Sequence, residues 1–490
     1  MFDVNSTALR ALSRIVSALA AAAGLAACAS LDHQPLGAAQ IDVSSLGARP
    51  AAIEWPVEDW WRRYDDSQLD ALIADGIIGA PTLAAARARI ARADAAAGVA
   101  RAALLPEVSG NANSLYQRYS ENYIFPPPLG GSWNSDNRLS LDFNYEIDFW
   151  NKNGAAFEAA LSQAQAAAAD AQAARLVLTT NIARAYFDLQ RLFAQREVSL
   201  AAITQREEVV RLTAQRFDAG LDTKVEAKQA DAALGTVRTE LAQYDEAINV
   251  ARIRIAALVG AGPQRGDRLV AVKGTRAPAI AVPAVVPLDL VGRRPEIVAS
   301  RWRVEAAGHD IEVARAMFYP NVNLVAFIGL SSIGFSNLIA AGSTIAGVGP
   351  AIHQPIFEGG RLNANLRGRE ADSALAVSAY NQAVIDAVRD VAEALASIYG
   401  LGRTSVEQAR AREATTDAYN LAVVRYRAGL GNYLTVLTAQ TQQLVQDRLD
   451  ADLRARAFEL DVNLARALGG GYAEASNVNL SAAPGVTGTR

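Results

Sequence analysis

The chain contains 490 residues with a formal net charge of −4, a length that suits two or three ordinary domains or one elongated structure built from repeats. It has no long basic block, and this argues against a nucleic-acid partner, which would require clustered Lys and Arg. Hydrophobic residues make up 51% of the chain, but Ala contributes much of that share, and Ala-rich segments favour closely packed helices. With one Cys and three His, the sequence allows no internal disulfide and predicts neither a metal site nor a cofactor.

The N-terminus predicts a lipoprotein signal. Arg10 and Arg14 precede an apolar run over residues 15–27, which is long enough for the core of a signal peptide and short for a helix that spans a bilayer. The run ends at Cys28, in a Leu-Ala-Ala-Cys sequence that resembles the bacterial lipobox. We therefore expect residues 1–27 to be removed and Cys28 to carry a lipid anchor in the outer membrane. A plain secretory signal with a chance cysteine is the alternative.

Residues 28–105 are expected to hold the lipid-anchored segment and a first helix, and residues 106–151 a β-hairpin. Apolar and polar residues alternate without a break over 138–149, so a strand there has one apolar face and one polar, partly acidic face. We interpret the polar face as lumen-facing, and its acidic residues are Asp142, Glu146 and Asp148. The segment has the length of a tilted membrane-spanning strand, roughly 9–11 residues. The partner strand over 107–119 is weaker, and an ordinary soluble hairpin is the alternative.

Residues 152–262 predict a pair of long helices. The stretch 154–217 contains no proline and would extend roughly 95 Å as one helix, at about 1.5 Å per residue. Gly220 follows that stretch, and glycine there supplies the left-handed conformation that ends a helix. Rods of this length are rare in soluble globular domains and suit a tunnel across a periplasm.

The chain is internally duplicated. Segment 99–102 (Val-Ala-Arg-Ala) recurs at 313–316, and segment 216–221 (Arg-Phe-Asp-Ala-Gly-Leu) recurs at 425–430 as Arg-Tyr-Arg-Ala-Gly-Leu. Nearly equal spacing between these landmarks predicts two copies of one structural unit.

The second copy is expected to follow a Pro-rich linker at 263–290. It comprises a helix at 291–319, a β-hairpin at 320–358 and a second pair of long helices at 359–469, before a loose tail at 470–490. Its strands are expected at 321–330 and 347–357, where Pro350 and Pro355 weaken the last one. Apolar residues at steps of three and four over 377–401 form a heptad seam.

The fold class expected from these elements is mainly α with transmembrane β, in duplicated strand-hairpin and long-helix units. No segment after the signal predicts a transmembrane helix, so a membrane would be crossed by strands. Four strands cannot close a barrel, and about 8 strands is the smallest known number. Several chains must therefore associate, and three chains would pool twelve strands around a lumen.

This layout resembles the TolC-like outer-membrane factors, in the lipoprotein branch often labelled NodT. The resemblance covers residues 28–470 and rests on motifs at 145–150 (Tyr-Glu-Ile-Asp-Phe-Trp), 293–296 (Arg-Arg-Pro-Glu) and 314–320, and on 355–361 (Pro-Ile-Phe-Glu-Gly-Gly-Arg). It implies a homotrimer with a 12-stranded β-barrel in the outer membrane, continued through the periplasm by a 12-helix α-barrel. It also implies a periplasmic adaptor and an inner-membrane pump, commonly of the resistance-nodulation-division class. The implied activity is passive conduction of substrates that the pump delivers.

The resemblance assigns roles to the two helix-turn-helix tips. The implied adaptor-contacting residues are Arg216, Ala219, Gly220 and Leu221, and Arg425, Ala428, Gly429 and Leu430. Members of the family often carry aspartates just after the second tip, where Thr435 and Thr438 stand here. Because threonine cannot form a carboxylate ring, other residues are candidates for closing the periplasmic entrance. The full set of gate candidates is Asp218, Asp222, Glu226, Arg425, Tyr426, Thr435 and Thr438.

Other functions remain as alternatives. A coiled-coil lipoprotein scaffold would have no use for the alternating strand at 138–149, and an adaptor subunit would lack the whole-chain duplication. An exit channel for type I protein secretion stays open. The sequence contains no catalytic motif of a metalloprotease, serine hydrolase or nucleotide-binding loop, so we expect no enzymatic activity and treat a hydrolase as remote. The substrate is not predicted.

Overall fold

The computed structural model describes residues 38–49, 54–272, 287 and 289–474. The predicted signal peptide, Cys28, most of the 263–290 linker and the tail from residue 475 lie outside the described residues. The chain forms two compact units. The first contains Arg92–Ala164 and Trp302–Ala379, besides the residues before Ile41, and the second contains Ile41–Ala91, Gln165–Arg301 and the chain from Tyr380 onward.

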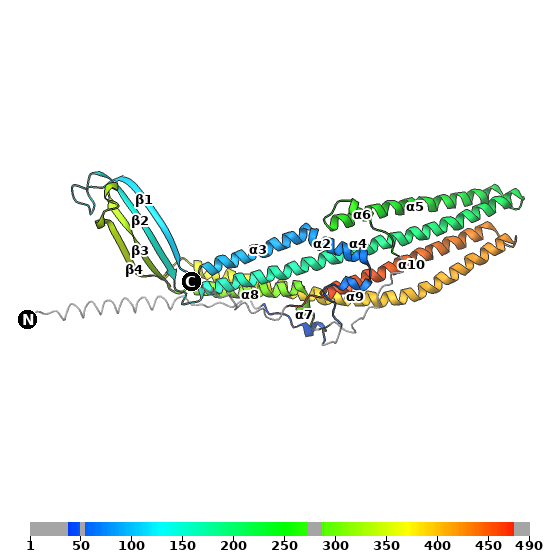
Figure 1. Cartoon of the computed structure of the whole chain (residues 1–490). Coiled ribbons are helices and arrows are strands. Elements are labelled where there is room, and N and C mark those ends of the chain that lie inside the picture. Colours follow the sequence, from blue (N-terminus) through cyan, green and yellow to red (C-terminus); the bar gives the residue numbers. More distant parts are fainter. Residues whose placement is uncertain (1–37, 50–53, 273–286, 288, 475–490) are drawn as a thin grey trace, which may run out of the picture. The chain divides into compact units, whose positions relative to one another are not determined.

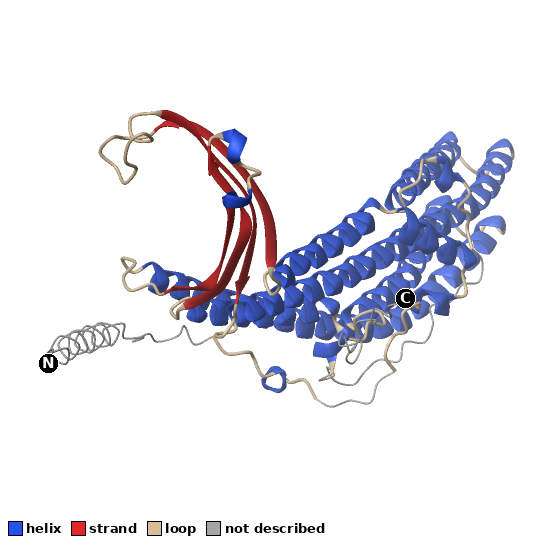
Figure 2. Cartoon of the chain, turned by 60° about the vertical axis from the view of Figure 1, so that its left-hand side comes forward, coloured by secondary structure: helices blue, strands red, loops and turns tan. Residues whose placement is uncertain are grey.

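The first unit is organised around one antiparallel sheet with strand order β1-β2-β3-β4, which Figure 2 shows as strongly curved. Its strands are β1 Glu107–Arg118, β2 Trp133–Glu146, β3 Asn321–Ile333 and β4 Thr344–His353. The hairpin of the second repeat therefore pairs directly with that of the first, through register pairs such as Leu141↔Ile328 between β2 and β3. Two short 3-10 helices, η3 (Phe335–Asn337) and η4 (Ala341–Ser343), occupy the β3–β4 connection.

Several strand ends differ from those expected: β2 begins earlier, at Trp133, β3 ends later, at Ile333, and β4 begins earlier, at Thr344. β2 ends at Glu146, so Asp148 lies beyond the strand and accepts hydrogen bonds from the backbone nitrogens of Lys152 (2.6 Å) and Gly154 (2.8 Å) at the start of α4. The Asp148 carboxylate pairs with two of the backbone N–H groups that the first turn of a helix leaves unpaired. This capping is more favourable than continuing the strand through Asp148. β4 ends before Pro355, which has no N–H to donate, and it includes Pro350 because an edge strand tolerates proline.

The helices repeat with equal lengths in the two halves (Figure 1). α3 (Pro81–Ala102) and α8 (Pro295–Ala316) have 22 residues each, α4 (Lys152–Asp218) and α9 (Arg361–Arg427) have 67, and α5 (Lys224–Leu258) and α10 (Tyr433–Ala467) have 35. The duplication read from short motifs thus extends to whole elements. The heptad seam on α9 is packed as predicted: Val384, Ala387 and Val391 are buried.

Shorter helices complete the second unit. They are α2 (Ser67–Gly79), α6 (Gln264–Asp267) and α7 (Leu290–Arg293), together with the 3-10 helices η1 (Val43–Leu46) and η2 (Trp60–Tyr64). Aromatic side chains of η2 and apolar side chains of α2 pack against Ile182, Tyr186 and Phe187 of α4. This core was not predicted from the sequence.

A buried carboxylate fastens η2 to α10. Asp461 has no exposed surface, and its Oδ2 accepts hydrogen bonds from the Tyr64 hydroxyl (2.5 Å) and from the Arg63 guanidinium. Burial raises the pKa of the Asp461 carboxyl, and the Arg63 charge opposes that shift. The N-terminal segment is thereby tied to the last long helix.

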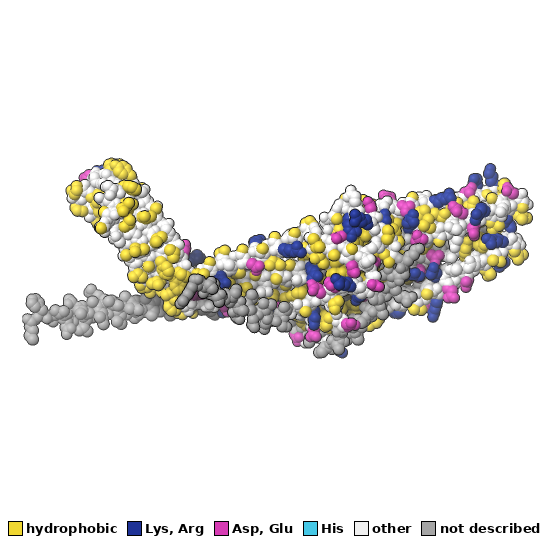
Figure 3. Space-filling model, viewed as in Figure 1, with side chains coloured by type: hydrophobic (Ala, Val, Ile, Leu, Met, Phe, Trp, Pro, Cys, Tyr) yellow, Lys and Arg dark blue, Asp and Glu magenta, His cyan; other side chains and the backbone are white. Residues whose placement is uncertain are grey.

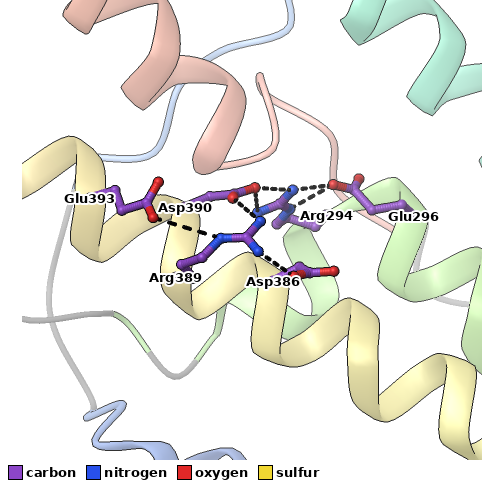
Figure 4. Close-up of polar contacts among 6 residues, drawn as sticks. All are labelled: Arg294, Glu296, Asp386, Arg389, Asp390 and Glu393. Carbon is purple, nitrogen blue, oxygen red and sulfur yellow. Dashed lines mark hydrogen bonds and ion pairs between the residues drawn. The ribbon is translucent and has the colours of Figure 1, made fainter.

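An ionic cluster fastens the start of α8 to α9 (Figure 4). The Arg294 side chain, 6% exposed, donates to Glu296 (2.7 Å from Nε) and to Asp390 (3.1 Å). Arg389 adds bonds to Asp386 and Asp390. In the first repeat the residue before the helix-starting proline is Ala80, which joins the apolar core instead. The two repeats therefore secure the same junction by different chemistry.

Candidate functional site

The candidate site is formed by the tips of the two helical hairpins, both in the second unit. At the α4–α5 tip, Gly220 has a φ of +69°, and the Leu221 nitrogen donates to the Arg216 carbonyl at 2.8 Å. At the α9–α10 tip, Gly429 has a φ of +74°, and the Leu430 nitrogen donates to the Arg425 carbonyl at 2.8 Å. The two turns are the same helix-terminating motif, which requires a left-handed residue.

Three side chains join the two tips. The Tyr426 hydroxyl donates a hydrogen bond to Oδ2 of Asp222, and Nε of Arg216 lies 3.0 Å from the same oxygen. Arg216 also donates to the Tyr426 carbonyl at 3.1 Å, and its guanidinium carbon lies 4.6 Å from the centroid of the Tyr426 ring. Tyr426 is fully buried, and the Arg216 and Asp222 side chains are 13% and 11% exposed. We call these three residues the tip cluster.

The electrostatics of the tip cluster keep its charges fixed. Burial raises the pKa of the Tyr426 hydroxyl, and its bond to Asp222 raises it further. The hydrogen bond to Asp222 also raises the pKa of the Arg216 guanidinium. Tyr426 therefore remains a neutral donor and Arg216 a cation throughout the physiological pH range.

The duplicated arginine has a different environment in the second tip. The position equivalent to Asp222 is occupied by Gly431, so Arg425 has no acidic partner in its own turn. Arg425 is exposed, and within the described part of the chain its guanidinium donates only to the Leu430 carbonyl, at 3.5 Å. The Arg216 guanidinium is therefore bonded to residues of its own chain, whereas the Arg425 guanidinium is exposed at the surface.

Two predicted gate residues, Glu226 and Thr435, are bonded to helix N-cap residues in this structure. Glu226 and Thr223 form a capping box at the start of α5, in which the Thr223 nitrogen donates to Glu226 at 2.9 Å. At the equivalent place in α10, the Thr435 nitrogen and hydroxyl both donate to the Asn432 side chain, at 3.0 and 2.8 Å. The Thr-x-x-Glu signature of the first cap was readable from the sequence. Asp218 and Thr438 are exposed, and neither side chain forms a hydrogen bond or ion pair within the described residues.

Apart from Arg216, which is bonded within the tip cluster, the predicted adaptor-contacting residues are exposed on the tips. Ala219 and Gly220 are exposed, as are Ala428 and Gly429. Leu221 and Leu430 are 65% and 71% exposed, although both are large apolar side chains. Exposed apolar residues at equivalent places of two repeats indicate a surface that a partner covers.

The sheet of the first unit has two chemically distinct faces. Cross-strand neighbours place Leu141, Ile328 and Val348 on the apolar face, and these side chains are 58%, 59% and 77% exposed. Asp142 and Glu146 lie on the opposite, polar face, where Asp142 accepts from Ser140 (2.7 Å) and Glu146 pairs with Lys152 (2.5 Å). Figure 3 shows hydrophobic side chains spread along the visible side of the sheet and charged ones gathered over the helices.

No single helix among the described residues is long and apolar enough to cross a membrane, and the bent pair α2 and α3 together has the required length and composition. The described part of the chain contains no group of three or more His, Cys, Asp or Glu that could hold a metal ion.

Comparison with known families gives a match over both repeats. A protein-family model described as "Outer membrane efflux protein" matches residues 72–261 and 286–470. The fusaric acid resistance protein FusA of Burkholderia cepacia is 39% identical over 370 residues, which are 73% of this chain and 69% of that protein. The multidrug resistance outer membrane protein MdtP of Shigella flexneri is 31% identical over 480 residues, which are 94% of this chain and 98% of that protein.

Solved structures agree with the sequence relatives. The outer membrane protein VceC of Vibrio cholerae superposes with a TM-score of 0.81 at 37% identity, covering 85% of this chain and all of that one. The outer-membrane channel OprN superposes with a TM-score of 0.80 at 27% identity, covering 90% of this chain and 98% of that one.

Proposed function

Because this chain belongs to the outer membrane efflux protein family and is therefore an outer-membrane channel of an efflux system, we propose that it acts as a passive exit duct in a tripartite assembly. In this proposal an inner-membrane pump of the resistance-nodulation-division class delivers substrates, and a periplasmic adaptor connects that pump to the channel. The channel itself supplies the path and no catalytic step.

The observation that carries the proposal is the four-stranded sheet with an exposed apolar face and two edges. Within the described residues, β1 and β4 each pair on one side only. Unpaired backbone groups are not tolerated in a bilayer, so these edges require partners. Three copies joined edge to edge would give twelve strands, a number that leaves room for a lumen. The apolar face then contacts lipid, and Asp142 and Glu146 line the lumen.

The tips of the helical hairpins are the proposed meeting point with the adaptor. Exposed Leu221 and Leu430 supply apolar contact area, and Arg425 supplies a charge without an acidic partner in its own turn. The tip cluster is the proposed closing device of the periplasmic entrance, because its bonds hold the two hairpins of one subunit together. Opening the entrance would require these bonds to be exchanged.

A lipid anchor at Cys28 is proposed from the lipobox. Cys28 lies outside the described residues, and the support is its position after the apolar run at 15–27. Several acyl chains on one residue would anchor firmly, since each buried methylene contributes about 0.8 kcal/mol. Radiolabelled palmitate should enter the wild-type protein and should not enter Cys28→Ser.

We propose small organic molecules as the class of substrate. The printed names of the relatives refer to resistance to fusaric acid and to several drugs, and the exposed polar face of the sheet suits solutes that travel with water. Deletion of the gene should raise the sensitivity of cells to such compounds, and the unaltered gene should restore resistance.

Single-channel recording in a planar bilayer tests the duct directly. The purified protein should run as a heat-sensitive trimer and should conduct ions in discrete steps once the tips are released. Arg425→Ala should raise the conductance of a tightly shut channel if Arg425 is a latch, and an unchanged conductance would reject that role. A monomer that never conducts in any tip variant would contradict the proposed function.

A further inference from the structure

The polar face of the sheet is itself divided into two stripes. On β1 and β2 it carries hydrogen-bonding and acidic side chains, among them Asn111, Ser140 and Asp142. On β3 and β4 the middle of the same face carries Val325, Phe327, Gly329, Ile345, Gly347 and Gly349, flanked on β3 by Asn323 and Ser331. A water-filled lumen has no general need for an apolar stripe, so this half of the wall requires an explanation.

Arg138 stands on the boundary between the stripes. It is the only Lys or Arg on the polar face of the described strands, whereas Glu107, Asp136, Asp142 and Glu146 share that face. Its guanidinium carbon lies 5.2 Å from the centroid of the Phe327 ring, within the range of a cation–π contact. On the described strands, this single fixed cation in an acidic wall is where an anionic solute would meet attraction.

The charge of Arg138 is available to such a solute. The nearest carboxylate recorded is Asp142, with the two groups 4.0 Å apart. Asp142 already accepts hydrogen bonds from Ser140 (2.7 Å) and Asn111 (2.9 Å). The Arg138 side chain is 48% exposed, and within the described residues no hydrogen bond of its guanidinium is recorded. Its N–H groups can therefore bind an incoming carboxylate in the paired geometry that guanidinium favours.

Gly347 fixes the position of the aromatic ring. A Cβ at residue 347 would lie 2.7 and 2.8 Å from two atoms of the Phe327 ring, closer than side-chain atoms approach. The glycine lets that ring lie against β4, where the ring also contacts Arg138, and a larger residue at 347 would displace the ring. Gly347 therefore places the Phe327 ring, and the ring lies against the Arg138 guanidinium.

We propose that Arg138 and Phe327, with the apolar stripe of β3 and β4, form a transit site for organic anions that have a flat apolar body, such as aromatic carboxylates. The carboxylate binds the guanidinium, and the apolar body lies along Phe327 and the neighbouring Val325 and Ile345. The site rests on the proposed function, because it requires the polar face to line the lumen. The wall contacts the solute on one side only, so the solute binds weakly. A conducting path requires weak binding because the solute must also leave the site.

The test measures salicylate permeation through the purified channel in a planar bilayer. A Tyr426→Phe background releases the tips, so that the strands and not the entrance limit the current. Reversal potentials in salicylate against chloride give the permeability ratio of the two anions. Arg138→Gln should lower that ratio by roughly threefold, as for loss of an exposed ionic contact, and Arg138→Lys should restore only part of it because it lacks the planar fork.

Matched variants separate the site from a general charge effect. Arg118→Gln removes the same charge from the apolar face, where Arg118 pairs with Glu121 at 2.7 Å, and should leave the ratio unchanged. Phe327→Leu should lower the ratio without altering charge, and Gly347→Ala should lower it by displacing the ring. If Arg138→Gln fails to assemble into a heat-sensitive trimer, the salicylate permeability ratios of Phe327→Leu and Gly347→Ala test the transit site instead.

The outcomes distinguish the transit site from the proposed function. Discrete potassium chloride currents with an unaltered salicylate ratio in Arg138→Gln, or in both Phe327→Leu and Gly347→Ala, would overturn the transit site and leave the duct intact. Absence of any potassium chloride current in the unsubstituted background would instead contradict the duct.

Discussion

The Tyr426 hydroxyl donates a hydrogen bond to the Asp222 carboxylate, so a residue at the end of α9 is bonded to a residue in the turn after α4. Arg216 reinforces the contact by pairing with Asp222 at 3.0 Å and lying over the Tyr426 ring. The two helical hairpins of one chain are therefore fastened at their tips through three side chains. Separation of the hairpins at their tips must break this contact.

Removing the hydroxyl alone should loosen the tips. Tyr426→Phe deletes one hydrogen bond of about 1 kcal/mol, and we expect the population of open channels to rise about fivefold. Asp222→Ala also strands the Arg216 cation and should open the channel further. Because both variants act on the same contact, Tyr426→Phe combined with Asp222→Ala should add little to Asp222→Ala alone. Open probability in single-channel recordings is the measurement.

A control comes from the repeat itself. Phe217 occupies the position of Tyr426 in the first tip and is 44% exposed, so Phe217→Leu should leave the open probability unchanged. Equal currents from wild type and Asp222→Ala would show that the tip cluster does not restrain the channel.

An aspartate at position 431 should convert the second tip into a copy of the first. A Cβ at Gly431 would lie 3.5 Å from the Tyr426 nitrogen, an ordinary contact, so Gly431→Asp should fold. The new carboxylate should pair with Arg425 as Asp222 pairs with Arg216. If Arg425 serves the channel by contacting another molecule, this variant should weaken adaptor binding in a pull-down assay, and Gly431→Asn should have a smaller effect. Undiminished binding in Gly431→Asp would show that Arg425 is not needed at the interface.

Features that depend on periodicity could be predicted from the sequence. The strand alternation around Leu141 and the proline-free stretch of α4 specify their elements locally, and the recurrence of the Arg216 motif at Arg425 reveals the duplication. The predicted TolC-like fold and the efflux-channel function are confirmed by the relatives and by the match to VceC. These predictions succeed because long helices and two-faced strands leave their pattern in consecutive residues.

Features that depend on long-range pairing could not be predicted. Asp222 and Tyr426 were both gate candidates, but a separation of 204 residues gives no sequence sign that they bond to each other. Arg425 was one gate candidate among seven, and the absence of an acid at Gly431 became meaningful only beside the Arg216–Asp222 pair of the first tip. The burial of Asp461 under Tyr64 likewise required the fold. The role of Glu226 is different, since its capping box is local and was overlooked.

Loss of the cation in the α8–α9 cluster should destabilise the second unit. Arg294→Ala would leave Glu296 and Asp390 without their shared partner, and both carboxylates are partly exposed, at 39% and 34%. Partial screening by water reduces the cost of a broken buried pair to about 2 kcal/mol. Thermal unfolding of the trimer should therefore begin at a lower temperature in Arg294→Ala.

A surface ion pair on the same helix supplies the control for that measurement. Arg410 pairs with Glu407 at 3.2 Å, but both side chains are more than 70% exposed. Arg410→Ala should leave the unfolding temperature unchanged, since exposed pairs contribute little. Comparable losses from the two variants would mean that the Arg294 cluster has no special role.

The two tip helices should respond differently to acid. The hydrogen bond from Thr223 lowers the pKa of the Glu226 carboxyl, so the stabilisation that Glu226 gives to α5 is complete above the ordinary Glu pKa and is lost as the pH falls through the lowered value. The cap of α10 is the Asn432 amide, which does not titrate in this range. Lowering the pH from about 7 to about 3 should therefore weaken the first turn of α5 and spare that of α10. Hydrogen exchange, corrected for intrinsic rates, should show faster exchange at Val225 and Glu226 but not at the equivalent α10 amides. Glu226→Gln should abolish the difference, and equal acid responses of the two helices in the wild type would refute the capping assignment.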